Sequence, residues 1–232
     1  MFNQSFNPRS VSFNIIFINI LFFLVHDIIG GDRNPELKHL MENYCALHYP
    51  GSSLFMPLQF VTYMFMHEGF WHIFGNMFGL FMFGTILERV WGPKRFFIFY
   101  FVTGLGAAFT YVAVQAFTVY HLTGSINPPL ELISHSLQFS EIYLEPTLGA
   151  SGAIFGILIA FAMLFPNMEL MFLFFPVPIK AKYLVGAYLI YEIWGAHANN
   201  PNDHVAHFAH LGGALFGFIL VKIWSRNRTH LY

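Results

Sequence analysis

Residues 96–117 read FFIFYFVTGLGAAFTYVAVQAF, and no charged side chain interrupts this run. A helix rises about 1.5 Å per residue, so a run of this length can cross the roughly 30 Å hydrocarbon core of a bilayer. Lys94 and Arg95 stand immediately before the run, where a bilayer surface would begin. The sequence therefore predicts a membrane-spanning helix at about residues 95–118.

The composition of the whole chain agrees with a membrane protein. Of 232 residues, 56% are hydrophobic and only 10% are charged, whereas ordinary globular proteins carry roughly 25% charged residues. The net charge of −1 excludes the basic surface that a nucleic-acid partner requires. Cys45 is the single cysteine, so the chain has no internal disulfide and no cysteine-based zinc site.

Five more apolar runs of suitable length flank the first one. The expected spans are about 10–29, 69–90, 146–165, 181–197 and 204–223, with outer loops at about 31–68 and 120–145. The run 170–179 is too short to cross and contains Pro176 and Pro178, so we expect it at the membrane interface. A signal peptide is a weaker interpretation of the first run, because only Arg9 precedes it and no small-residue cleavage site follows. We therefore expect an all-α, six-helix membrane bundle that forms a single domain over residues 1–232.

The distribution of cations predicts the orientation of this bundle. In a six-span chain, both termini and the 2–3 and 4–5 links lie on one side, and that side carries nine of the 11 Lys and Arg residues. These residues are Arg9, Arg89, Lys94, Arg95, Lys180, Lys182, Lys222, Arg226 and Arg228. Positive loops mark the cytoplasmic face, so both termini are predicted to be cytoplasmic.

Polar groups inside spans are costly and are candidates for function. Ser151 lies in GASGAIFG and His210 in AHLGGALFG, each near the outer end of a span that runs inward. Both are expected roughly 5–10 Å below the outer surface, so the two side chains can meet. The small residues beside them (Gly149, Gly152 and Gly156; Gly213 and Gly217) also suit close helix packing, which is the alternative interpretation of each motif.

Span two brings further polar groups to the same depth. His72 and Asn76 are four residues apart, so they share one helix face near the outer end. A serine needs a base, for which His210 is the candidate, and no Asp or Glu at this depth on these three helices could orient the imidazole. Phe155 could position the ring by stacking. His72, Asn76 and the Ser151 backbone N–H could stabilise an oxyanion, and Gly149 permits close approach of the backbone.

These motifs in this order resemble the rhomboid intramembrane serine proteases across essentially the whole chain. HEGFWHIFGN (67–76) matches the family pattern H-x4-H-x3-N. The residues at the family positions are His67, His72 and Asn76; Gly149 and Ser151, with Gly152 beside them; His210, Gly213 and Gly217; and Gly84, Glu88 and Gly92 in G-x3-E-x3-G.

The resemblance implies a Ser151–His210 dyad, with His72, Asn76 and Gly149 at the oxyanion and His67 and the packing glycines in support. It implies a cavity that opens outward, single-span membrane proteins as substrates, the lipid bilayer as surroundings, and no cofactor or metal. From the cation bias we expect a bacterial cytoplasmic membrane.

Two rival interpretations stay open. A catalytically silent rhomboid-like protein would bind membrane clients without cleaving them. A metal site could use His204, His207 and His210, although at i+6 the helix has turned about 120° and no carboxylate is expected at this depth. Glu192, inside span five, is expected either to face outer water or to pair with a neighbour.

Overall fold

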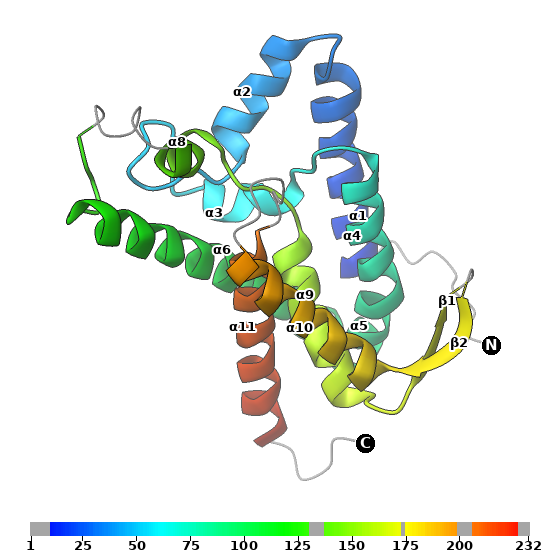
Figure 1. The fold of residues 1–232 in the computed structure, drawn as a ribbon. Helices are drawn as coiled ribbons and strands as arrows, with labels where there is room; N and C mark the ends of the chain where they lie inside the picture. The colour runs from blue at the N-terminus through cyan, green and yellow to red at the C-terminus, as the bar shows by residue number, and fades with distance from the viewer. Residues whose placement is uncertain (1–9, 130–136, 173–174, 199–205, 227–232) are drawn as a thin grey trace.

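The computed structural model describes residues 10–129, 137–172, 175–198 and 206–226. The chain is mostly helical and has one small hairpin (Figure 1). The elements are α1 (Val11–Phe23), the π-helix η1 (Leu24–Gly30), α2 (Pro35–Cys45), α3 (Gln59–Thr62), the 3-10 helix η2 (Tyr63–Phe65), α4 (Phe70–Gly79), the π-helix η3 (Leu80–Gly84), α5 (Thr85–Trp91), α6 (Pro93–Thr123), α8 (Leu137–Leu144), α9 (Ser151–Leu164), β1 (Glu169–Phe172), β2 (Phe175–Lys180), α10 (Ala181–Ala198) and α11 (His207–Arg226).

Four helical stretches within the described residues are long and apolar enough to cross a membrane. They are Val11–Gly30, Phe70–Trp91, Pro93–Thr123 and His207–Ser225. The other two predicted spans are also helical, but α9 has only 14 residues, and the 18 residues of α10 include Lys182 and Glu192. The chain is thus a multi-pass membrane protein, and its last predicted span begins partly outside the described residues.

The 31-residue helix α6 has clear signals at both ends. Pro93 occupies the first turn, where a missing N–H costs nothing. Gly124 ends the helix in the left-handed conformation with φ of 73°, and its N–H bonds to the Tyr120 carbonyl. This helix is longer than the predicted span 95–118 because its last turns continue beyond the apolar run.

The two predicted outer loops contain short helices. In Figure 1, α2 and α3 lie beside the upper part of α1 and above α9 and α11, and α8 lies in the second loop. Gln59 is fully buried and fixes the first loop with four hydrogen bonds. Its Oε1 accepts from the backbone N–H groups of His48 and Met56, and its Nε2 donates to the carbonyls of Asn43 and Leu54.

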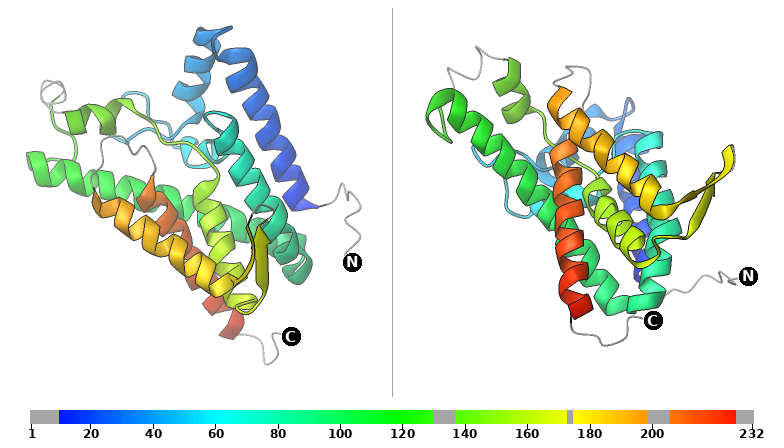
Figure 2. Two further views of the ribbon diagram at one scale, coloured as in Figure 1. Left: turned by 45° about the vertical axis from the view of Figure 1, so that its right-hand side comes forward. Right: turned by 60° about the horizontal axis from the view of Figure 1, so that its bottom comes forward.

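The prediction of an all-α fold is wrong at the segment between α9 and α10. Strands β1 and β2 pair antiparallel there, with Glu169 opposite Lys180 and Leu170 opposite Ile179. Pro176 and Pro178 have no N–H and cannot continue a helix, but both strands of a two-stranded hairpin are edges that tolerate proline. The hairpin projects from the side of the bundle in Figure 1 and in the right view of Figure 2.

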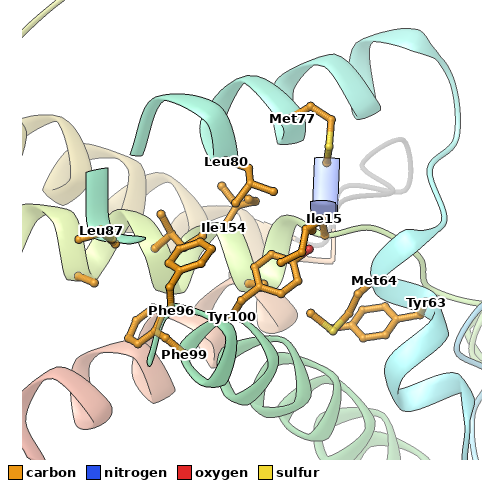
Figure 3. Packing of buried hydrophobic residues seen from close by; sticks show 14 of the residues in the cluster. Ile15, Tyr63, Met64, Met77, Leu80, Leu87, Phe96, Phe99, Tyr100 and Ile154 are labelled. Atoms are coloured by element: carbon orange, nitrogen blue, oxygen red, sulfur yellow. The ribbon is translucent and has the colours of Figure 1, made fainter. Parts of the chain in front are cut away.

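The packed core lies between α1, α4–η3–α5, α6 and α9 (Figure 3). Phe96, Phe99 and Tyr100 of α6 are fully buried and lie beside Leu80 and Ile154. Helix α11 packs against both α6 and α9, and α10 crosses α9 to reach α11. In Figures 1 and 2, α1 begins and α11 ends toward the same side of the bundle, as an even number of passes requires.

Candidate active site

Ser151 is the first residue of α9, and the preceding backbone fixes its position. Thr147 exchanges two backbone hydrogen bonds with Leu47, of 2.8 and 2.9 Å. The Gly149 N–H donates to the Tyr63 carbonyl at 2.9 Å. The start of α9 is therefore tied to the first outer loop. Because α9 starts here, the N–H groups of its first turn have no acceptor within the helix.

The structure brings Ser151 and His210 into contact. Ser151 Oγ lies 2.8 Å from His210 Nε2, across the packing of α9 against α11. Glycines make this approach possible: a Cβ on Gly213 would overlap the Gly152 carbonyl, and a Cβ on Gly217 would lie 2.8 Å from Gly156 Cα. The glycines therefore pack the two helices closely, as predicted, and this close packing brings Ser151 and His210 into contact.

Phe155 lies against the imidazole of His210. The two ring centroids are 4.3 Å apart and the planes differ by 13°, which is a stacked arrangement. The ring of Tyr188 on α10 also lies near Phe155, with the two centroids 5.6 Å apart. His210 is only 8% exposed. Its ring is thus held by an aromatic contact on α9, one turn after Ser151.

His72 is also placed beside Ser151, through Gly149. Gly149 has φ of 130°, which an L-residue with a side chain rarely adopts, and a Cβ there would lie 2.8 Å from His72 Nε2. His72 Nδ1 accepts a 3.4 Å hydrogen bond from the Glu68 backbone N–H. The hydrogen of a neutral His72 is then on Nε2, the atom beside Gly149.

Asn76 is on the same helix, α4, and is 7% exposed. Among the residues that the structure describes, its Nδ2 has no hydrogen-bond partner. A buried amide donor without a partner costs about 1–3 kcal/mol, so it suggests a role in binding an acceptor that arrives with a ligand.

His67 stands just before α4 and is fully buried. Its ring meets the His72 ring edge to face at 5.0 Å. Neither ring nitrogen has a hydrogen-bond partner within the described part of the chain. Burial, with the neighbouring His72 ring, lowers the pKa of His67 to about 3, so this imidazole is neutral and supports His72 by packing.

The structure also places a carboxylate at the site, which the sequence analysis did not expect. Glu192 Oε2 lies 2.6 Å from His207 Nδ1 and 3.0 Å from His210 Nδ1. Glu192 therefore pairs with neighbours, the second of the two expectations for it. The prediction that no carboxylate lies at the depth of these histidines is wrong, because α10 supplies Glu192. The sequence did contain a signal for this carboxylate, because Glu192 is a lone acidic residue within the apolar run 181–197.

The three residues Glu192, His207 and His210 could also hold a metal ion, since one ligand atom of each lies within 4.8 Å of the others. His204, the third histidine of the predicted metal set, lies outside the described residues. The observed set is therefore two histidines and one carboxylate from two helices.

Comparison with known proteins identifies the family of this chain. Residues 54–227 match the family model described as the Rhomboid domain. The chain belongs to the rhomboid family. The resemblance stated from the sequence motifs is thus confirmed, and the mostly helical membrane architecture is that of a rhomboid domain.

Curated rhomboid relatives match most of this chain. It is 26% identical over 227 residues to Rhomboid protein 1, mitochondrial, of Saccharomyces cerevisiae, covering 96% of this chain and 56% of that protein. It is 28% identical over 245 residues to the human Presenilin-associated rhomboid-like protein, mitochondrial, covering 98% and 55%. RHOMBOID-like protein 12, mitochondrial, of Arabidopsis thaliana is 30% identical over 168 residues, covering 72% and 46%. This rhomboid chain thus spans 46% to 56% of the length of these three relatives.

Proposed function

We propose that this rhomboid protein is an intramembrane serine endopeptidase that hydrolyses a peptide bond in or near the transmembrane segment of a single-span membrane protein. The observation that carries the proposal is the 2.8 Å contact between Ser151 Oγ and His210 Nε2 at the end of two packed helices. Family membership supports it, because the motifs that define the resemblance contain both residues.

The first step is the attack of Ser151 on the substrate carbonyl carbon. The Ser151 hydroxyl donates its hydrogen bond to His210 Nε2, which takes the proton as the C–O bond forms. The carbonyl π electrons move to oxygen and produce a tetrahedral oxyanion. His210 is then protonated at both nitrogens, and Phe155 keeps its ring stacked in place.

The oxyanion needs donors that are already in position. The Ser151 backbone N–H points out of the first turn of α9, where the helix dipole also favours negative charge. His72 Nε2 beside Gly149 and the unpartnered Nδ2 of Asn76 supply two side-chain donors. Each such donor contributes roughly 3–4 kcal/mol to transition-state stabilisation in comparable sites.

Collapse of the oxyanion breaks the C–N bond, and His210 gives its proton to the leaving amine. The product is an ester between Ser151 Oγ and the new C-terminal carbonyl. Water then attacks this ester while His210 Nε2 accepts its proton, and the proton returns to Ser151 Oγ as the acid product leaves. No cofactor takes part in this sequence.

We further propose that the chain crosses the membrane six times, with both termini in the cytoplasm and the site near the outer surface. The cation distribution supports this sidedness. The curated relatives named above are described as mitochondrial, so they give no support to the predicted bacterial membrane. The proposed topology holds for any membrane with the cation-rich side as the inner face.

The test is fluorophosphonate labelling of the purified protein in detergent, together with cleavage of a panel of single-span substrates. Wild-type protein should label and cleave, and Ser151→Ala and His210→Ala should do neither while keeping the wild-type melting temperature. Substantial cleavage by either variant would contradict the dyad. Absence of both labelling and cleavage in the wild type would instead favour the client-binding alternative.

A further inference from the structure

Helix α10 carries a buried carboxylate that the proposed mechanism does not use. Glu192 is 2% exposed. An ionised carboxylate in an apolar interior is costly unless it is paired and hydrogen-bonded. We therefore expect the buried Glu192 carboxylate to have hydrogen-bonding partners.

The Glu192 carboxylate faces two imidazoles from α11. Its Oε2 forms a 2.6 Å hydrogen bond with His207 Nδ1 and lies 3.0 Å from His210 Nδ1. The contact with His210 is at ion-pair distance, but the ring N–H does not point along it. Catalytic hydrogen bonds are often poorly aligned in the absence of substrate and tighten in its presence.

The close approach of α10 and α11 is built into the sequence. Gly195 lies against the His207 ring, and a Cβ at that position would overlap the ring. Ala181, Val185 and Glu192 are the buried residues of α10 among those described, so Glu192 is on the face of the helix that packs inward. The carboxylate is thus held by the packing of α10 against α11 and by its hydrogen bond with His207.

A carboxylate this close to Nδ1 favours one tautomer of His210. A carboxylate only accepts hydrogen bonds, so an imidazole nitrogen that faces it is stabilised when it carries hydrogen. With hydrogen on Nδ1, a neutral His210 has its lone pair on Nε2, the atom 2.8 Å from Ser151 Oγ. The other tautomer would present an N–H to Ser151 and could not take its proton.

We propose that Glu192 is a positioning residue, which with His207 as its own support holds His210 in the tautomer that can accept the Ser151 proton. The inference rests on the proposed protease function and deepens it from a dyad to a Ser151–His210–Glu192 relay of contacts. In the transition state, the carboxylate also stabilises the imidazolium that forms next to it.

The same residues could bind a metal, but the distances favour the proton-mediated arrangement. Zinc bonds of about 2.0–2.2 Å to nitrogen and oxygen in tetrahedral geometry separate two ligand atoms by about 3.3 Å. The 2.6 Å between Glu192 and His207 is shorter and is a hydrogen-bond length. A metal on His210 Nδ1 would also displace the hydrogen from that atom. The ring hydrogen would then be on Nε2, which could no longer act as the base.

The test compares Glu192→Gln and Glu192→Asp with a matched control, Glu169→Gln. Glutamine keeps the shape of the side chain but can offer an N–H, which favours the wrong tautomer. Aspartate keeps the acceptor. Glu169 is exposed on β1, beyond the end of α9 opposite to Ser151, and undergoes the same exchange. We expect Glu192→Gln to lower kcat by at least about tenfold with KM changed by less than about twofold, Glu192→Asp to recover part of kcat, and Glu169→Gln to match the wild type.

Two readouts separate positioning from a structural role. Rates are divided by the concentration of fluorophosphonate-reactive sites, so loss of folded protein does not count as loss of kcat. ¹⁵N-histidine NMR of the full chain in micelles reports the tautomer directly, with His210→Ala and His207→Ala to assign the signals. The wild type should show His210 with hydrogen on Nδ1, and Glu192→Gln should lose this preference.

Several outcomes would overturn the inference. These are an unchanged kcat per reactive site in Glu192→Gln, a His210 tautomer that is the same in wild type and variant, or stoichiometric zinc in the purified protein that disappears in His207→Ala. If the wild type neither labels nor cleaves, the proposed protease function fails. The tautomer comparison would still decide whether Glu192 orients His210, because it needs no turnover.

Discussion

Ser12 donates both its backbone N–H, at 2.9 Å, and its hydroxyl, at 2.6 Å, to Oε2 of Glu88, a residue 76 positions later in the sequence. Val11 donates its N–H to the other carboxylate oxygen at 2.7 Å. The N-terminus of α1 is therefore capped by a side chain of α5. The negative charge is also placed where the helix dipole favours it.

The first prediction follows from this cap. Glu88→Ala should lower the free energy of unfolding by about 2–3 kcal/mol, because buried donors lose a charged acceptor. Thermal unfolding in detergent, followed by size-exclusion chromatography, reports this loss as a fall in melting temperature. Glu169→Ala removes an exposed glutamate and is the control. Equal melting temperatures for the two variants would show that the cap contributes nothing.

The second prediction concerns the contact between α9 and α11. Gly213→Ala should separate the two helices, because the added Cβ would overlap the Gly152 carbonyl. Both the melting temperature and fluorophosphonate labelling should fall, since Ser151 and His210 lie on these helices. Gly186→Ala on α10 is the matched control, because a Cβ there meets nothing within 4 Å. Normal labelling of Gly213→Ala would contradict the role given to this packing.

The third prediction is a loss of stability in acid that depends on His67. The pKa of His67 in the folded chain is about 3, lowered first by burial and then by His72, against about 6.5 in an unfolded chain. The unfolded state therefore binds more protons, so stability is full above pH about 6.5 and is lost as the pH falls toward 3. His67→Phe should reduce the loss of melting temperature between pH 7.5 and 5.

The control for His67 is His39→Gln. His39 is on α2 with 74% of its side chain exposed. The acid-dependent loss in this variant should equal that of the wild type. If His67→Phe also matches the wild type, protonation of His67 does not drive the destabilisation.

Much of this architecture could be predicted because membrane spans are long apolar runs. The predicted span 69–90 is helical over Phe70–Trp91, and Ser151 and His210, placed at one depth by counting residues, are in contact. Counting gives depth but not the rotation of a helix about its axis. Helix α10 is apolar on most sides, so no pattern indicates that Glu192 faces inward. The structure was needed to place this carboxylate beside His210.

The fourth prediction concerns the proposed oxyanion donors, His72 and Asn76. Asn76→Ala and His72→Ala should each lower kcat by about 10²–10³-fold, the usual effect of removing one such donor. KM should change little, because the donors act on charge that develops only in the transition state. Steady-state kinetics with one cleavable substrate separates the two parameters.

Asn14→Ala is the matched control for Asn76→Ala, because Asn14 is an exposed asparagine on α1. It should leave kcat and KM at their wild-type values. If Asn76→Ala instead raises KM and leaves kcat unchanged, Asn76 binds the substrate in its ground state. The unpartnered Nδ2 of Asn76 would then be a binding group and not an oxyanion donor. We expect kcat to fall in both Asn76→Ala and His72→Ala, and both kcat and KM to stay unchanged in Asn14→Ala. This result would place two side-chain donors from one face of α4 at the reacting carbonyl.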